Sequence, residues 1–179
     1  MKRISGKGLI IIGYQGIGKS SIASQLNGTV DLESSSFKID GKRDDNWFTI
    51  YCCIAVSLAR QGYTVMISSH ECVVNELAKY NTEGKYSVII ICPNYILKGP
   101  WIEKLYNRYH DDPSEKNKIA WTNAELHFDS QINNLATNSS FSHIFIEDMN
   151  YDLNAIIRGL KTISHDQSIF VPLNRMEGY

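Results

Sequence analysis

The 179-residue sequence predicts an α/β domain in which helices cover both faces of a five-stranded, mainly parallel sheet. Short β-branched, apolar segments alternate with segments whose apolar residues recur at helical spacing, which is the pattern of a three-layer α/β/α sandwich. The segments Gly8–Ile12 and Tyr86–Cys92 are apolar almost throughout, as expected of strands covered on both faces. A glycine-rich turn, GYQGIGKSS (Gly13–Ser21), directly follows the first of them.

Five segments have the apolar, β-branched composition of strands. They are Gly8–Ile12, Thr29–Leu32, Tyr63–Ser68, Tyr86–Cys92 and Ser142–Glu147. The clearest helix runs from Trp47 to Ala59, with Asp44–Asn46 as a cap and Gly62 as a stop.

Three more helices are expected further along the chain. A shorter one covers about 71–80, and the next has Pro100 in its first turn and an apolar stripe from Trp101 to Tyr109. A longer helix follows the polar segment 111–118 and carries an apolar face from Trp121 to Leu135. The tail, about 165–179, shows no clear period and is expected to be an edge element, a packed strap or loose.

Length and composition predict one domain that spans residues 1–179. The 43% hydrophobic content suffices for a core, and no repeat or linker divides the chain, although a polar insertion at about 34–46 and a lid-like segment at about 98–118 stand out. The 18 basic residues balance 19 acidic ones without blocks of like charge, so nucleic acid is not favoured as a partner. The sequence does not determine the oligomeric state, and a homodimer is one of the options.

Cysteine use and hydropathy indicate the compartment. No C-x-x-C pair occurs, and we expect the four cysteines, Cys52, Cys53, Cys72 and Cys92, to be buried free thiols. No stretch approaches the roughly 18 apolar residues that cross a bilayer, so no membrane partner is expected. The sequence thus predicts a soluble, cytoplasmic protein.

The glycine-rich turn carries the most specific motif. Four fixed positions match G-x-x-x-x-G-K-[ST] between a strand and a helical segment, whose backbone amides converge on phosphate oxygens. Lys19 would bridge the β- and γ-phosphates of ATP, and Ser20 would place its hydroxyl on Mg²⁺. The predicted nucleotide-binding residues are Gly13, Gly16, Ile17, Gly18, Lys19, Ser20 and Ser21. The alternative to this interpretation is a chance glycine turn between a strand and a helix. The sequence lacks the GTPase motifs N-K-x-D and D-x-x-G, which excludes a GTPase.

A second group of polar residues, in TVDLESSSF, follows the second predicted strand. Ligands of open parallel sheets bind beyond the carboxyl ends of strands, so Asp31, Glu33 and Ser34–Ser36 should lie near the phosphate loop. An acidic group there can hold Mg²⁺ through water or accept a hydrogen bond from a substrate hydroxyl. A helix cap or a turn is the alternative.

These motifs together resemble a known family. The phosphate loop, DLESSSF, the following helix, VMISSH and IICPNYILKGPWIEKLYNRY resemble the small phage-type nucleoside or deoxynucleoside monophosphate kinases, relatives of adenylate kinase, over about Gly8 to Glu147. The resemblance implies a P-loop NTPase fold and transfer of the γ-phosphoryl group of ATP, with Mg²⁺, to a nucleoside or deoxynucleoside monophosphate. If a phage encodes the chain, the expected compartment is the host's cytoplasm.

The resemblance also implies roles for individual residues. Asp31 and Glu33 would surround the metal and the acceptor, and Arg108 would be a lid arginine that acts with Lys19 and Asp31 in catalysis, with Lys104 one turn earlier. Alternatively, Lys104 and Arg108 only solvate the polar face of a helix. The sequence departs from the family at the end of the third strand, where Ser68, Ser69 and His70 replace an acid, and in having a single lid arginine.

The remaining candidates concern the acceptor. Arg43, with Lys38 and Lys42, could grip its phosphate or be a solvated loop cation, and His70 could touch the substrate or cap a helix. The predicted substrate-binding residues are Glu33, Ser35, Arg43 and His70, and the predicted metal ligands are Ser20 and Asp31. Two rival functions stay open. One is a small-metabolite kinase, similar to shikimate kinase, in which Asp31 or Glu33 binds the acceptor hydroxyl; the other is a nucleotide-binding regulatory protein without turnover.

Overall fold

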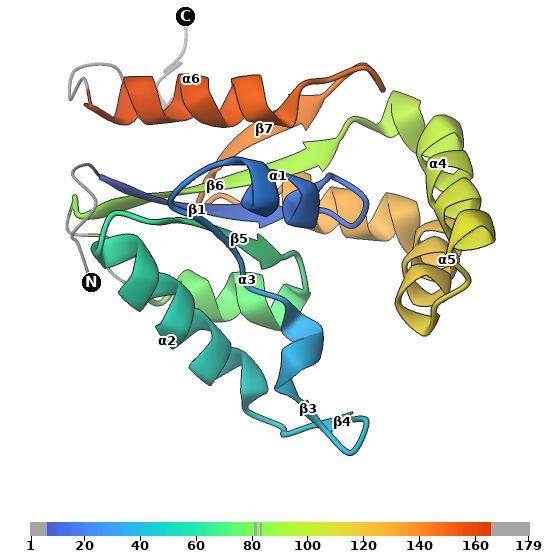
Figure 1. The fold of residues 1–179 in the computed structure, drawn as a ribbon, viewed down its shortest axis with the longest axis horizontal. Coiled ribbons are helices and arrows are strands. Elements are labelled where there is room, and N and C mark those ends of the chain that lie inside the picture. Colours follow the sequence, from blue (N-terminus) through green and yellow to red (C-terminus); the bar gives the residue numbers. More distant parts are fainter. Residues whose placement is uncertain (1–6, 81, 83, 166–179) are drawn as a thin grey trace, which may run out of the picture.

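A parallel sheet of five strands forms the centre of the computed structural model, which describes residues 7–80, 82 and 84–165 (Figure 1). The strand order is β2-β5-β1-β6-β7, and every neighbouring pair is parallel. The bounds are Gly8–Gly13 for β1, Thr29–Asp31 for β2, Thr64–Ser68 for β5, Tyr86–Pro93 for β6 and Ser142–Ile146 for β7. All five predicted strands are confirmed.

Strand β1 occupies the middle of the sheet because its side chains are apolar on both faces. Ile10, Ile11 and Ile12 are fully buried between β5 and β6. At its end Gly13 is in register with Ser68 of β5 and Ile91 of β6. The carboxyl ends of these three strands therefore meet where the glycine-rich turn begins.

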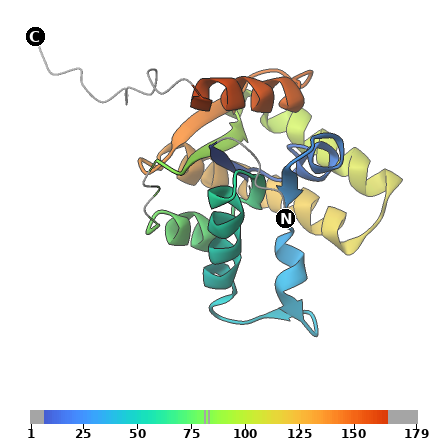
Figure 2. The same cartoon turned by 60° about the vertical axis from the view of Figure 1, so that its left-hand side comes forward.

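Within the described residues, six α-helices surround the sheet (Figures 1 and 2). Their bounds are Lys19–Gln25 for α1, Trp47–Arg60 for α2, Glu71–Leu77 for α3, Lys98–Asp111 for α4, Glu115–Ala136 for α5 and Leu153–His165 for α6. Helix α6 lies along one face, α2 and α3 lie along the other, and α4 with the start of α5 forms an arm at one side of Figure 1. Among the described residues, no helix combines the length and apolarity needed to cross a membrane.

Several sequence-based boundaries were wrong. Helix α6 was not predicted, although Leu153, Ile157 and Leu160 are spaced for one buried helical face. Helix α5 begins at Glu115, inside the segment expected to be a loop, because the Ser114 side chain caps it by accepting a hydrogen bond from the Asn117 amide. Helix α3 ends at Leu77, three residues before the predicted end. The predicted tail lies largely in residues 166–179, outside the described residues.

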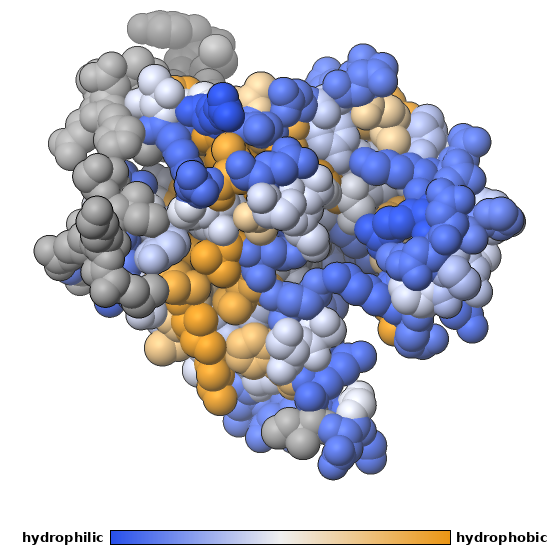
Figure 3. Space-filling model, in the orientation of Figure 1, coloured by the Kyte–Doolittle hydropathy of each residue, from blue (hydrophilic) through white to orange (hydrophobic). Residues whose placement is uncertain are grey.

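The insertion after β2 contains regular structure. It consists of a 3-10 helix, η1 (Ser34–Phe37), and a short antiparallel hairpin of β3 (Lys38–Ile39) and β4 (Lys42–Arg43). A second 3-10 helix, η2 (Tyr95–Leu97), leads into α4. The hairpin and the α4–α5 arm lie on opposite sides of a hollow whose visible surface is mainly hydrophilic (Figure 3).

The prediction for the cysteines holds in part. All four are free thiols, and Cys52 and Cys92 are buried as expected. Cys53 is exposed and Cys72 is half-buried. Cys53 follows Cys52 on α2, and a single helical step turns it away from the sheet.

Candidate functional site

The phosphate loop joins β1 to α1 in a tight turn. Gly16 and Gly18 have φ values of 82° and 102°, in the left-handed region that favours glycine. A Cβ atom on Gly16 would lie 2.8 Å from Cδ2 of Leu105, a residue of α4. The glycines of the motif thus permit both the turn and the close approach of the α4 helix.

Lys19 folds back over this loop. Its Nζ atom donates to the carbonyl oxygens of Gly13 at 2.7 Å and Tyr14 at 3.3 Å. Burial lowers the pKa of Lys19 to about 8, and the carboxylates of Asp31 and Glu33 oppose that shift. The negative charge of a bound polyphosphate would further stabilise the charged form of this partly desolvated ammonium.

Ser20 and Asp31 place two hard oxygen atoms next to each other beside the loop. The Ser20 hydroxyl donates to Oδ2 of Asp31 at 2.5 Å, which joins the start of α1 to the end of β2. Mg²⁺ is commonly held by one or two protein oxygens, with water and phosphate completing its shell. The donor set fits such an ion, and no group of three or more His, Cys, Asp or Glu residues elsewhere in the described chain forms a metal cage.

The end of β5 is organised by Tyr51 of α2. Its hydroxyl donates to the Leu32 carbonyl oxygen at 2.6 Å and accepts from the Ser68 amide at 2.9 Å. Burial raises the pKa of Tyr51 to about 12, so it remains a donor at neutral pH. The Ser68 hydroxyl oxygen is buried without a hydrogen-bond partner. Sequence reasoning read Tyr51 only as part of a helical apolar face.

Arg43 and His70 meet at the indole ring of Trp47. The Arg43 guanidinium lies 4.4 Å from the ring centroid and donates to the carbonyl and hydroxyl oxygens of Ser34, at 3.3 and 3.2 Å. The His70 ring contacts the same indole edge to face, with centroids 5.7 Å apart. Burial, and then the charges of Arg43 and Lys19, lower the pKa of His70 to about 4, so its imidazole is neutral at pH 7.

The two lid cations differ in their surroundings. Arg108 is half-buried on α4, its Nε atom has no hydrogen-bond partner, and burial lowers its pKa. Lys104 donates to the Tyr151 hydroxyl at 3.0 Å and lies against the rings of Trp101 and Tyr151. Arg108 therefore keeps its Nε–H donor available for a ligand, whereas Lys104 is already held by Tyr151 and by the two rings.

Trp101 and Tyr151 hold the phosphate loop from behind. The Trp101 indole donates to the Gln15 carbonyl oxygen, and the Tyr151 hydroxyl donates to the Ile17 carbonyl oxygen, both at 2.9 Å. The two rings stack with centroids 5.9 Å apart and planes at 14°. We call this arrangement, Trp101 and Tyr151 on the two loop carbonyls, the loop clamp. Tyr151 was not singled out from the sequence.

Lys116 reaches Glu33 across the site. The ammonium group, near the start of α5, pairs with Oε2 of Glu33, just beyond β2. Burial alone would raise the pKa of Glu33, but the hydrogen bond and charge of Lys116 lower it overall. Lys116 was missed because a lysine at the start of a helix carries no local signal for a partner 83 residues away.

A cleft of about 1400 Å³ connects these groups. Every predicted site residue lines it: Gly13, Gly16, Ile17, Gly18, Lys19, Ser20, Ser21, Asp31, Glu33, Ser35, Arg43, His70 and Arg108. Lys38 lines it too, whereas Lys42 does not. The structure thus brings the predicted residues together, and the role of each stays a prediction.

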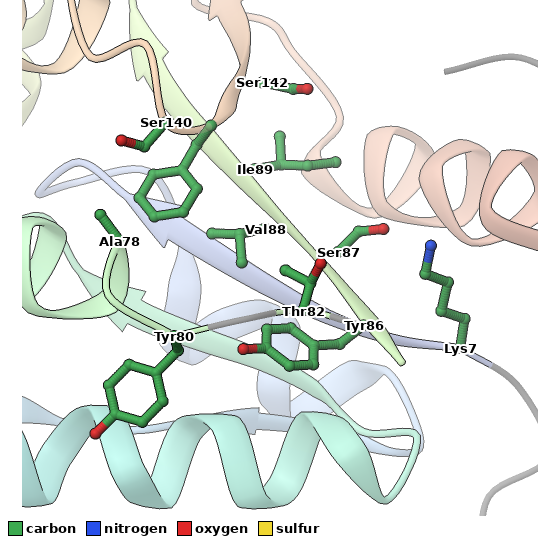
Figure 4. A pocket seen from close by; sticks show the side chains of 11 residues that line it. Lys7, Ala78, Tyr80, Thr82, Tyr86, Ser87, Val88, Ile89, Ser140 and Ser142 are labelled. Carbon is green, nitrogen blue, oxygen red and sulfur yellow. The ribbon is translucent and has the colours of Figure 1, made fainter. Parts of the chain in front are cut away.

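A second, smaller hollow of about 410 Å³ lies at the opposite end of the strands (Figure 4). It is lined mainly by hydroxyl and aromatic side chains near the first residues of β6 and β7, with Lys7 at its edge. None of the predicted site residues lines it. The large cleft is therefore the candidate functional site.

Known proteins resemble this chain in structure and not in sequence. No protein-family model and no curated sequence matches the chain. A tunicamycin resistance protein from Deinococcus radiodurans has a similar structure, with a TM-score of 0.51 and 14% identity over 88% of this chain and 95% of that chain. A gluconokinase from Sinorhizobium meliloti 1021 is also similar, with a TM-score of 0.50 and 12% identity over 93% of this chain and 99% of that chain. With the parallel sheet and the phosphate loop, these likenesses show the predicted fold, a P-loop α/β/α sandwich with a five-stranded parallel sheet.

Proposed function

We propose that the chain transfers the γ-phosphoryl group of ATP to the phosphate of a nucleoside or deoxynucleoside monophosphate. The observation that carries this proposal is one continuous cleft of about 1400 Å³ with the phosphate loop and a separate basic group, Lys38 and Arg43, in its lining. Ligand pockets for one small molecule are usually about 300–1000 Å³. The larger volume supports two substrates bound side by side.

The phosphate loop would bind the triphosphate. Loop amides and Lys19 would neutralise the β- and γ-phosphates, and Arg108 would approach from α4 with an unpaired Nε atom. Ser20 and Asp31 would hold Mg²⁺, which when bound offsets phosphate charge. Phosphoryl transfer needs mainly positioning and charge neutralisation, and these residues supply both.

The basic group supports an anionic acceptor. Arg43 uses two of its five N–H donors on Ser34, so others remain for a phosphate, and the Trp47 ring fixes the guanidinium in place. His70, Ser35 and Glu33 line the same cleft and offer hydrogen bonds to the rest of the acceptor. A monophosphate acceptor is already a nucleophilic anion, so no strong general base is required.

A second candidate is a kinase that phosphorylates a hydroxyl group of a small metabolite. Glu33 favours it, because a carboxylate that lines the cleft two residues after Asp31 can accept a hydrogen bond from an acceptor hydroxyl. In that case Arg43 would bind a carboxylate of the acceptor.

A substrate panel separates these functions. Ribo- and deoxyribonucleoside monophosphates, gluconate and shikimate are each incubated with ATP and Mg²⁺, and ADP and phosphorylated products are measured. We expect diphosphates from one or more monophosphates, and Lys19→Ala should abolish them. Product from gluconate or shikimate alone would favour the second candidate. ATP binding without any product would reject both and indicate a nucleotide-binding protein without turnover.

A further inference from the structure

The ion pair of Glu33 and Lys116 bridges the two walls of the cleft. Glu33 follows β2, whereas Lys116 belongs to the α4–α5 arm, so the pair links two walls that are far apart in sequence. The Lys116 side chain is 58% exposed and the Glu33 side chain 35% exposed. Ion pairs this exposed contribute little to stability, so a charged ligand can replace either partner.

Lys116 belongs to the same cluster of charges as Lys19. Burial is the main cause of the lowered pKa of Lys19, and the positive charges of Lys116 and Arg108 add to it. All three line the cleft. They come from three different elements, α1, α4 and α5.

The two carboxylates nearby are not equivalent. Asp31 is bound by the Ser20 hydroxyl, whereas Glu33 is bound by Lys116. In this arrangement the charge of Lys116 is neutralised by a side chain that we assign to the acceptor. Arg108, by contrast, has an unpaired Nε atom.

We propose that Glu33 holds Lys116 in reserve until an acceptor binds, and that Lys116 then contacts the transferring phosphoryl group. This inference rests on the proposed transfer of the γ-phosphoryl group of ATP. A hydroxyl or N–H group of the acceptor takes the place of Lys116 on Glu33, and the released ammonium turns to the γ-phosphate oxygens. Lys116 is then a catalytic residue, and Glu33 couples its use to the presence of the acceptor.

The coupling limits a wasteful reaction. In productive transfer, an acceptor oxygen forms a bond to the γ-phosphorus, the bond to the β–γ bridging oxygen breaks, and ADP leaves. In hydrolysis, water supplies the oxygen and the products are ADP, inorganic phosphate and a proton. Without an acceptor, Lys116 stays on Glu33 and the γ-phosphoryl group lacks one of its three cations, so hydrolysis is slow.

Hydrolysis of Mg²⁺-ATP in the absence of any acceptor tests the coupling. Glu33→Gln keeps the size of the side chain and removes its charge, so it frees Lys116. We expect hydrolysis to rise at least about tenfold, a small part of the 10³–10⁵ that a catalytic arginine supplies in related chemistry. Adding Lys116→Met to Glu33→Gln should return the rate to that of the wild type.

Lys118→Met is the matched control, because Lys118 is exposed on the same helix and does not line the cleft. Added to Glu33→Gln, it should leave the raised rate unchanged. An unchanged rate in Glu33→Gln, or a raised rate that survives Lys116→Met, would overturn the proposal.

Transfer kinetics supply a second measurement that does not depend on the Glu33 variant. At saturating ATP and acceptor, Lys116→Met should lower kcat at least about tenfold with little change in the KM for ATP, and Lys116→Arg should restore most of it. An unchanged kcat would contradict a catalytic Lys116. If the wild type phosphorylates no monophosphate, the proposed acceptor class fails, and the acceptor-free hydrolysis rates still decide whether Glu33 restrains Lys116.

Discussion

Removing the loop clamp should weaken both the fold and the binding of nucleotide. Tyr151→Phe deletes the hydroxyl that donates to the Ile17 carbonyl oxygen and accepts from Lys104. Burial raises the pKa of Tyr151 to about 12, so this hydroxyl is protonated over the whole working pH range. A buried polar group left unpaired costs about 1–3 kcal/mol. Because Tyr151 is only half-buried, we expect a loss of about 1–2 kcal/mol.

Trp101→Phe should cost more. The Trp101 side chain is fully buried, and the change removes both the hydrogen bond to Gln15 and the volume of the larger ring. We expect a loss of about 3 kcal/mol from these two effects together. The double variant should not be additive, since the two rings stack and hold the same loop, and a coupling energy of about 0.5–3 kcal/mol is expected.

Urea unfolding measures these losses as shifts of the midpoint at constant m value. Tyr106→Phe is the matched control, because Tyr106 is an exposed tyrosine of α4 outside the loop clamp. Calorimetric titration with Mg²⁺-ATP reports the second effect, a several-fold weaker binding in Tyr151→Phe caused by a loosened loop. Stability and nucleotide affinity of Tyr151→Phe equal to those of Tyr106→Phe would refute the clamp.

Three further changes probe the proposed site. Lys19→Met should abolish nucleotide binding yet raise the thermal stability of the unliganded protein at pH 7. The reason is that burial lowers the pKa of Lys19 to about 8, so the charged form is disfavoured in the folded state. For the same reason, the stability of the wild type should increase as the pH rises above about 8, where the folded state loses this proton before the unfolded state does. Asp31→Asn should raise the Mg²⁺ concentration for half-maximal turnover at least about tenfold, measured by metal titration at fixed ATP, and an unchanged requirement would exclude Asp31 from metal binding. Arg108→Lys should lower kcat at least about a hundredfold with little change in KM for ATP, because an ammonium cannot reproduce the guanidinium fork; steady-state kinetics with Lys98→Arg as a comparison would expose a nonspecific effect.

The sequence predicted the parts of the fold that local patterns determine. Strands β1 and β6 are apolar runs whose composition alone indicates burial, and the phosphate loop is a contiguous motif with required glycines. Residues Asp31 and Glu33 were found by a topological argument, because the carboxyl ends of neighbouring parallel strands lie together. Each of these inferences needed only one segment and the general rules of α/β folds.

The contacts that organise the site could not be read in this way. Tyr151 binds a loop carbonyl 134 residues earlier, and Trp101 reaches one 86 residues earlier. In the sequence, Trp101 is one apolar residue of a helical stripe, and nothing distinguishes its indole N–H as a donor to the loop. Helix α6 is a different case, since its periodic apolar residues were present in the sequence and were overlooked.

The end of β5 carries Ser68, Ser69 and His70 and offers no acid for the proposed Mg²⁺, so the carboxylates at the end of the neighbouring strand β2 are the alternative. Leu32 lies between Asp31 and Glu33, and its carbonyl oxygen is bound by Tyr51, whose hydroxyl also receives the Ser68 amide. Side chains two residues apart in an extended segment point to the same side, so Asp31 and Glu33 both face the cleft. The carboxylates thus lie on the β2 side of the loop, with Asp31 beside Ser20 and Glu33 beside Lys116. If Asp31 holds Mg²⁺ and Glu33 binds the acceptor, as proposed, this one short segment serves both, and the proposed mechanism needs no acid at the end of β5.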